Sequence, residues 1–452
     1  MAASASAVPS QTRIVNRWIQ LFAGMVAMMA IANLQYAWTL FTSPLMKNLH
    51  ASLAAVQVAF ATFILAETWL VPFEGYLVDK IGPRVMMMVG GVLVGIGWFG
   101  AGRATTIREL IVVYTIGGIG AGVVYGGTIG NALKWFPDHR GLCVGLTAGS
   151  YGIGTALTVA PIAKMLKVSG YQYTFTYWGL IQGAVVVLAA VLIVKPPANW
   201  IPPGWGEKED KLNKLHHLHT SHIDSTPLQM LKSPSFYLIY AMMTIVAFGG
   251  LVVTAQLAPI AKFYKVDTVT LAFGMSALVL AIEVDRVLNG LTRPFWGWVS
   301  DHIGRENTMF VAFALEALAV FALLQLIHKP VWFILLSGLT FFAWGEIFSL
   351  FPAITADLFG KTWATTNYGI VYTAKGLASV FAGPVAAMVS VKAGNWVPIF
   401  WAMIACDGVA ALLALFVLKP VAEKTITRNE ELRSEALAKA TEVKSQPVRG
   451  VA

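Results

Sequence analysis

Three cationic residues interrupt long apolar stretches of the sequence: Arg286, Arg293 and Lys375. A charge in mid-membrane is costly and usually marks a solute or proton path. At 1.5 Å per residue, Arg293 lies roughly 10 Å along its helix from the expected cytoplasmic end. Lys375 lies roughly 13 Å from the cytoplasmic end of its own helix. Arginine offers a two-pronged fork to a carboxylate and lysine offers a point charge. Arg293 and Lys375 together predict a site for a small dianion, or for a monoanion with an extra partner.

Four acids occupy similar apolar surroundings: Glu67, Glu283, Asp285 and Glu346. Because burial disfavours a charged carboxylate, one or more of them is a candidate for carrying a coupled proton. Ion pairs with the cations are the alternative. Glu283 lies three residues before Arg286 on a neighbouring helical face, so an ion pair is the favoured interpretation for Arg286.

Arg286 and Arg293 lie seven residues apart, with Asn289 between them. Seven residues are close to two helical turns, so the three side chains share one face. Arg286 could therefore line the same pathway as Arg293 even if an acid pairs with it.

The elements that must position these residues are membrane-spanning helices. Of the 452 residues, 57% are hydrophobic and only 12% are charged, and a soluble protein normally carries roughly twice that share of charge. Apolar stretches of spanning length fall near 18–43, 53–74, 85–103, 108–133, 143–163, 172–195, 235–261, 271–297, 308–327, 331–352, 366–391 and 395–418. This pattern predicts an all-α membrane protein with twelve transmembrane helices in two six-helix, pseudo-symmetric bundles.

The polar segments divide the chain and orient it. We expect a cytoplasmic N-terminus over 1–17, bundles over 18–195 and 233–418, a cytoplasmic linker over 196–232 and a cytoplasmic tail over 419–452. Lysine and arginine concentrate on the side of both termini, and the positive-inside rule places that side in the cytoplasm. The first stretch is too long for a signal peptide. The sequence has no Asn-x-Ser/Thr site, which favours a bacterial source and thus the inner membrane.

An internal repeat supports two homologous halves. Residues 75–82 read GYLVDKIG and residues 297–304 read GWVSDHIG. The shared positions include Gly75, Asp79 and Gly82 in the first copy and Gly297, Asp301 and Gly304 in the second. Parallel repeats place a substrate site between the halves, near the midplane.

GYLVDKIGPR, which ends on Arg84, resembles the signature loop of the major facilitator superfamily, and its second copy is followed by Arg305. The resemblance implies that these loops control gating and do not touch substrate. Five segments are similar to the oxalate/formate antiporter branch of that superfamily: LQYAWTL (34–40), SLAAVQ (52–57), KWFPDHRGL (134–142), NGLTRPFWGWVSDHIGR (289–305) and NYGIVYTAKG (367–376).

The branch resemblance implies roles for named residues. Arg293 and Lys375 match the arginine and lysine that bind substrate carboxylates in that branch. The surrounding aromatic and amide positions are Gln35, Tyr36, Gln57, Tyr151 and Trp344. The sequence departs from the oxalate carrier at Phe348 and Tyr372, where that carrier has tyrosine and tryptophan. The resemblance therefore implies a carboxylate and leaves its identity open.

We therefore expect a secondary transporter of small carboxylates that works by alternating access, with oxalate/formate-type antiport first. Proton-coupled uptake of a lactate- or pyruvate-like monocarboxylate is the second candidate, and a transport-derived sensor is a distant third. No nucleophile–base pair or nucleotide loop suggests an enzyme, and we expect no cofactor, no metal, no nucleic-acid partner and a monomer. The histidines of the linker, His216, His217, His219 and His222, are interpreted as part of a solvated loop.

Overall fold

The computed structural model describes residues 16–136, 140–197, 224–360, 363–425 and 427. Within these ranges the chain is helical apart from its connections and a single isolated bridge between Thr270 and Ser276. The linker histidines and the tail beyond residue 427 lie outside the described residues.

The first bundle contains the helices of residues 17–192. These are α1 (Arg17–Ile31), α2 (Asn33–Tyr36), α3 (Trp38–Asn48), α4 (Leu53–Trp69), α5 (Val71–Ile81), α6 (Pro83–Ala101), α7 (Ile107–Trp135) and α8 (Arg140–Leu192). Gly170, at φ 78° and ψ 170°, breaks α8 into two successive spans. A residue with a side chain would be strained at this φ.

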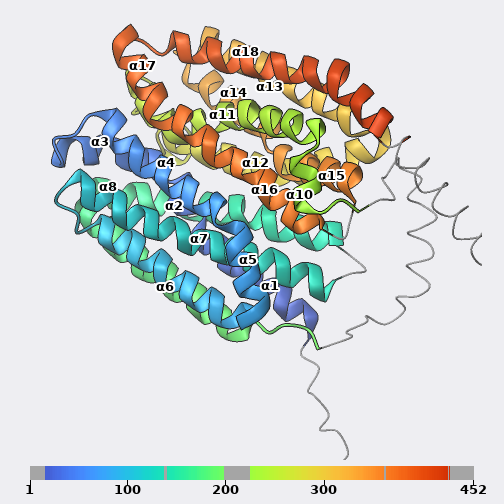
Figure 1. Ribbon diagram of the computed structural model, residues 1–452. Coiled ribbons are helices and arrows are strands. Elements are labelled where there is room, and N and C mark those ends of the chain that lie inside the picture. Colours follow the sequence, from blue (N-terminus) through green and yellow to red (C-terminus); the bar gives the residue numbers. More distant parts are fainter. Residues whose placement is uncertain (1–15, 137–139, 198–223, 361–362, 426, 428–452) are drawn as a thin grey trace, which may run out of the picture.

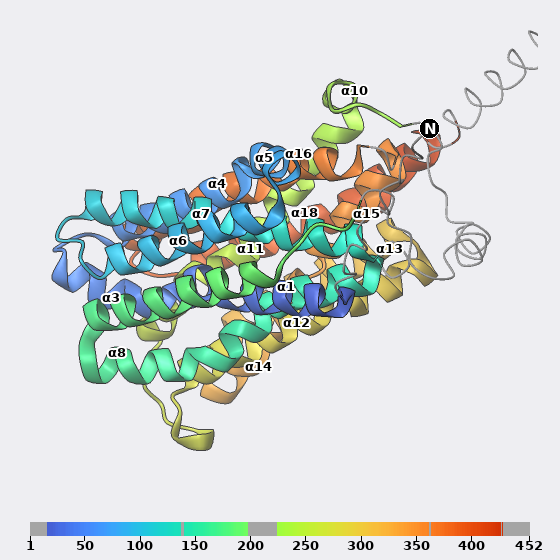
Figure 2. The same ribbon diagram turned by 90° about the horizontal axis from the view of Figure 1, so that it is seen from below.

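The second bundle follows a short helix, α10 (Pro227–Leu231). Its helices are α11 (Pro234–Phe263), α12 (Ala277–Ile303), α13 (Arg305–Leu326), α14 (Pro330–Trp344), α15 (Ile347–Phe359), α16 (Ala364–Val380), α17 (Ala386–Ala393) and α18 (Val397–Leu413). A 3₁₀ turn (Ala272–Gly274) precedes α12, and π-helical turns (Phe381–Val385 and Ala414–Leu418) follow α16 and α18. Figure 1 shows the two bundles as separate groups, one coloured blue to green and the other light green to red, that meet along α4 and α16. Seen from below, α1, α8 and α12 lie together along the same boundary (Figure 2).

Nine of the described helices are long and apolar enough to cross a membrane, or ten if the bent pair α4 and α5 forms one span. One of them, Gly145–Leu192, holds two spans because of the break at Gly170. Helix α12 has the length of a span, 27 residues, and carries the charges that set it apart from the apolar helices. These additions give the twelve predicted spans. Large apolar side chains project from the bundle surfaces, among them Leu157, Leu188, Leu318 and Phe416, as a lipid-facing protein requires.

Several predicted helices are broken near their middle. The first span is interrupted at Ala32 and Ala37, the second bends by 47° near Leu70, and the tenth breaks at Gly345 and Glu346. Gly345 packs so tightly against Thr292 that there is no room for a Cβ. Broken helices inside membrane proteins commonly border substrate sites, because the freed backbone groups need a polar lining.

The predicted eighth span, 271–297, begins too early. Helix α12 begins at Ala277, after a turn closed by the Thr270–Ser276 bridge. The hydroxyl of Ser276 accepts a hydrogen bond from the Val279 amide at 3.4 Å and caps the helix. An apolar run continues through this turn, so hydropathy alone could not locate the helix start.

The two copies of the repeat adopt the same backbone conformation. Gly82 has φ 107° and ψ 150°, and Gly304 has φ 89° and ψ 158°, so each glycine ends one helix in a conformation that other residues rarely adopt. The Arg84 side chain donates to the Ile193 carbonyl (2.9 Å), and Arg305 pairs with Asp357 (3.3 Å). The side chains of Asp79 and Asp301 lie outside the described part of the chain.

Both repeated turns lie at one end of the molecule. Ile193 lies just before the linker, and Asp357 lies beside Phe359, whose carbonyl accepts from the Ser225 amide at the linker's other end (2.8 Å). The copies therefore lie on the same side of the molecule, as parallel repeats do.

Candidate functional site

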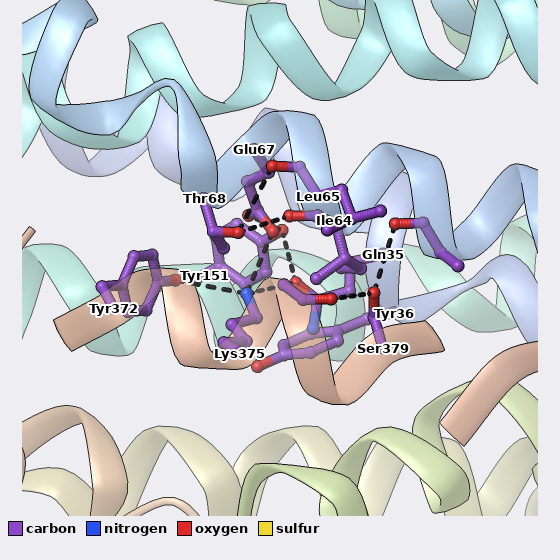
Figure 3. A network of polar contacts seen from close by, with 12 residues as sticks. Gln35, Tyr36, Ile64, Leu65, Glu67, Thr68, Tyr151, Tyr372, Lys375 and Ser379 are labelled. Atoms are coloured by element: carbon purple, nitrogen blue, oxygen red, sulfur yellow. Dashed lines mark hydrogen bonds and ion pairs between the residues drawn. The ribbon is translucent and has the colours of Figure 1, made fainter. Parts of the chain in front are cut away.

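Lys375 of α16 lies at the centre of a network that crosses the boundary between the halves (Figure 3). Its Nζ lies 3.0 Å from Glu67 Oε2 and 3.2 Å from Gln35 Oε1, both from the N-terminal half. It also donates to the Tyr372 hydroxyl at 3.2 Å. The Tyr151 hydroxyl lies 3.3 Å from Gln35 Oε1 and 3.4 Å from Glu67 Oε1. Glu67 could not be predicted as the partner of Lys375, because the two residues lie 308 positions apart in the chain.

Arg293 of α12 reaches the same boundary. Its Nη1 donates to the Ala148 carbonyl of α8 at 2.6 Å, and its Nη2 donates to Asn289 Oδ1 at 3.4 Å. The guanidinium lies over the Phe348 ring, with Cζ 4.5 Å from the ring centroid, and Lys375 Nζ lies 5.7 Å from the same centroid. Arg293 has no ion-pair partner among the described residues. The two cations therefore flank one ring, and an anion beside it could contact both.

Several tyrosine side chains lie around these cations. Tyr36 donates to Asn289 Oδ1 at 3.1 Å and packs edge-on against Tyr151, with ring centroids 5.0 Å apart. Tyr372 stacks on Tyr125, with centroids 6.0 Å apart. Tyr125 was not predicted as a site residue, because it lies in a glycine-rich helix without a polar pattern around it.

Two residues that the resemblance assigned to the site lie at its margin. Gln57 donates to the Ala255 carbonyl (2.8 Å) and to Gln256 Oε1 (3.0 Å), and it accepts from Trp38 Nε1 (3.0 Å). It lies ten residues before Glu67, about 15 Å along the helix, and ties the halves together there. Trp344 packs on Gly250, where no Cβ would fit, and lies edge-on to Phe348 at 5.3 Å. Trp344 therefore supports the ring that the two cations share.

The remaining predicted charges do not join the Lys375 network. Glu283 is half-buried, and it forms no ion pair with Arg286 in the described structure. Asp285 is fully buried and faces α14, where its Oδ1 lies 3.9 Å from the position that a Cβ on Gly338 would take. Arg286 is fully buried between the rings of Tyr36 and Phe341.

Glu346 belongs to a second group of buried acids, inside the C-terminal bundle. It interacts electrostatically with Asp407 of α18, which lies near Glu316 of α13. A Cβ on Gly249 would lie 3.0 Å from Glu316 Oε1 and 3.5 Å from the Asp407 oxygens. Counting three cations against four mid-membrane acids was therefore incomplete. Glu316 and Asp407 are the single acids of the stretches 308–327 and 395–418, which was the signal for them. The buried Glu74 of α5 was missed as well.

The central site is closed in this structure. Arg293 is 5% exposed and Lys375 is 2% exposed, and the neighbouring Gln35 and Tyr36 are buried as deeply. In such a low-dielectric setting charge-assisted hydrogen bonds are strong. Two cations and several hydroxyl and amide groups could thus hold a small carboxylate and shield it from water. No group of three or more metal-binding side chains occurs in the part of the chain that the structure covers.

Comparisons with known proteins identify the family of the chain. A family model for the Major Facilitator Superfamily matches residues 21–284 and 287–450. The chain is 36% identical to the oxalate:formate antiporter of Oxalobacter formigenes over 89% of this chain and 92% of that protein. It is 24% identical to the uncharacterized transporter YhjX of Escherichia coli, over 81% and 86% of the two chains.

The fold also matches a solved structure. The crystal structure of a D-xylose-proton symporter matches with a TM-score of 0.68 at 15% identity, over 89% of this chain and 98% of that one. At this identity the match speaks for the fold alone. The family match, the antiporter relative and the shared fold together establish that the chain belongs to the major facilitator superfamily, in its oxalate/formate antiporter branch.

Proposed function

We propose that this protein exchanges small carboxylate anions across a bilayer by alternating access, with oxalate and formate as the exchanged pair. The observation that carries the proposal is the convergence of Arg293 and Lys375 on one ring, at the boundary between the halves. The similarity to an oxalate:formate antiporter supports the choice of substrates.

In this proposal, oxalate binds between the two cations. One carboxylate accepts two hydrogen bonds from the guanidinium of Arg293, and the other pairs with the ammonium group of Lys375. Lys375 is already paired with Glu67 (3.0 Å), so the anion must compete with that carboxylate. Tyr36, Tyr151 and Gln35 offer further polar groups at the same place. Rocking of the halves about this site then opens it to either side in turn.

The repeated loops are proposed to govern that rocking. Each ends on a positive-φ glycine, and the arginines that follow them, Arg84 and Arg305, contact neighbouring helix ends. These contacts lie far from the Lys375 network, at the end of the molecule where the linker attaches. We further propose a monomer in the inner membrane of a bacterium, with both termini in the cytoplasm, as the distribution of lysine and arginine favours.

Purified protein in formate-loaded proteoliposomes tests the function. We expect rapid uptake of labelled oxalate that depends on internal formate and that external unlabelled oxalate inhibits. Empty liposomes and liposomes loaded with an uncharged solute are the controls. Oxalate uptake at the same rate with and without internal formate would contradict exchange.

The ion pair between Glu67 and Lys375 keeps a second function open, proton-coupled uptake of a monocarboxylate. A monoanion could bind Arg293 while Glu67 takes a proton and releases Lys375. The same liposomes, with an inward proton gradient and no internal anion, separate the two functions. Accumulation of lactate under the gradient would support symport, and its absence alongside oxalate–formate exchange supports antiport.

A further inference from the structure

Arg286 is buried without an acceptor for its charge. Its exposed fraction is 0%, and its Nε, Nη1 and Nη2 atoms form no hydrogen bond with any residue that the structure describes. A guanidinium keeps its positive charge and carries five N–H donors. A buried cation is normally paired or hydrogen-bonded, because an unpaired one is costly. Arg286 therefore has donors to offer to a ligand.

Two aromatic rings cover this guanidinium with their faces. Arg286 Cζ lies 3.9 Å from the Tyr36 ring centroid and 4.2 Å from the Phe341 ring centroid. Such stacking stabilises a cation through the ring faces, while the N–H groups at the edge need acceptors of their own. The adjacent Asp285 attracts Arg286 electrostatically, but it faces α14 and forms no ion pair with Arg286 in the described structure.

Tyr36 links Arg286 to the central site. Its ring covers Arg286, and its hydroxyl donates to Asn289 Oδ1 (3.1 Å), which also accepts from Arg293 Nη2 (3.4 Å). The two arginines share a face of α12 and are separated by about 10 Å along its axis. Both border the N-terminal half, since the Arg286 carbonyl and Gly290 pack on Gly152 of α8.

We propose that Arg286 is a second carboxylate-binding residue, which extends the range of substrates to dicarboxylates longer than oxalate. The inference rests on the proposed binding of one carboxylate at Arg293. The two carboxylate groups of oxalate are bonded directly to each other, so oxalate cannot reach two guanidinium groups that lie about 10 Å apart along a helix. A linear diacid with three or four methylene groups can place one carboxylate on each arginine. Glu67 already balances the charge of Lys375, whereas no described ion pair balances Arg286 or Arg293.

A chain-length series tests this inference. Unlabelled oxalate, malonate, succinate, glutarate and adipate compete with labelled oxalate for exchange in proteoliposomes. We expect inhibition to weaken at malonate and to recover at glutarate or adipate. In Arg286→Gln, the inhibition constant for glutarate should rise at least tenfold more than that for oxalate. Arg286→Lys keeps the charge without the fork and should give an intermediate ratio.

The matched control is Arg103→Gln. Arg103 also stacks on a ring, with Cζ 4.7 Å from the Phe99 centroid, but it is exposed. Its substitution should leave the glutarate-to-oxalate ratio unchanged. Size-exclusion chromatography checks that each variant is folded.

Two results would overturn the inference while leaving carboxylate exchange intact. One is a steady loss of inhibition from oxalate to adipate in the unaltered protein. The other is an equal change for oxalate and glutarate in Arg286→Gln, which would make Arg286 a structural residue. If the unaltered protein exchanged no oxalate, the proposed function would fail instead. Calorimetric binding of glutarate to the purified protein, and its loss in Arg286→Gln, would then decide the inference alone.

Discussion

The two halves of the molecule bring different chemistry to its centre. The C-terminal half supplies the cations, which are Arg286, Arg293 and Lys375. Among the described residues that meet them from the N-terminal half are an acid and neutral polar groups, namely Gln35, Tyr36, Glu67 and Tyr151. An anion should therefore bind mainly to the C-terminal half. The N-terminal half competes with the anion for Lys375 and covers the bound anion.

This asymmetry suggests how binding is coupled to movement. The ion pair between Lys375 and Glu67 ties the halves together when no anion is bound. A carboxylate on Lys375 weakens that tie and can accept hydrogen bonds from Tyr36 or Tyr151 in its place. The central contact would thus change partners during the cycle. Contacts remote from the anion, such as Gln57 on Gln256 (3.0 Å), would open in one state only.

The largest expected effect is at Arg293. Arg293→Lys keeps the charge and removes the planar fork, so two-point recognition of a carboxylate is lost. Loss of one charge-assisted hydrogen bond costs about 1.5–3 kcal/mol, or about ten- to more than a hundredfold in oxalate affinity. Equilibrium binding to purified protein measures it, with Arg103→Lys as control. Near-normal affinity in a folded variant would make Arg293 a structural residue.

Lys375→Gln comes next and sharpens the choice of substrate. Oxalate should bind at least tenfold more weakly, because one carboxylate loses its counter-charge in a low-dielectric site. Formate should suffer less, since Arg293 alone can hold a monoanion. Lys375→Arg should be milder than Lys375→Gln. The comparison is made by competition with labelled oxalate, and Lys392→Gln, at an exposed position, is the control. Equal losses for both anions would remove Lys375 from the dianion site.

Glu67→Gln should act in the opposite direction. It removes the carboxylate that competes with the anion for Lys375, so the affinity for oxalate should rise. A gain of about 1.4 kcal/mol in binding free energy corresponds to about a tenfold higher affinity. Exchange should slow, because the tie between the empty halves is weaker. Binding and exchange rates are measured on one preparation, with the exposed Glu423→Gln as control. Weaker oxalate binding in Glu67→Gln would show that Glu67 supports the anion and does not compete with it.

Tyr36→Phe should have the smallest effect. It keeps the ring that covers Arg286 and removes only the hydrogen bond to Asn289 (3.1 Å). A neutral hydrogen bond contributes about 0.5–1.5 kcal/mol, which corresponds to about a two- to tenfold change in oxalate affinity. Tyr76→Phe, at a position that is 61% exposed, serves as the comparison. A hundredfold loss would exceed the contribution of one neutral hydrogen bond and would show that the Tyr36 hydroxyl is a principal anchor of the anion.

The sequence was enough to predict the helical membrane fold and the repeat, because hydropathy and the glycine-rich turns are local signals. It also indicated Arg293 and Lys375, because a cation inside an apolar stretch is rare. The partners of these cations could not be predicted. Glu67 and Lys375 meet only when the halves assemble, and helical spacing carries no information about a contact over 308 residues.

Local spacing was misleading in one respect. Glu283 is three residues from Arg286, yet the two side chains form no ion pair, because Arg286 is drawn between the rings of Tyr36 and Phe341. The breaks inside the helices could not be predicted from the sequence pattern either. The first span is interrupted at Ala32 and Ala37, and alanine, the strongest helix former, gives no warning of a break.

The most direct test of the account is an experimental structure of the protein with oxalate bound. We predict density for one oxalate beside the Phe348 ring, with one carboxylate on the Arg293 guanidinium and the other on Lys375 Nζ. Glu67 should have moved away from its 3.0 Å contact with Lys375. Oxalate bound elsewhere, or bound with the ion pair between Glu67 and Lys375 unchanged, would contradict the account.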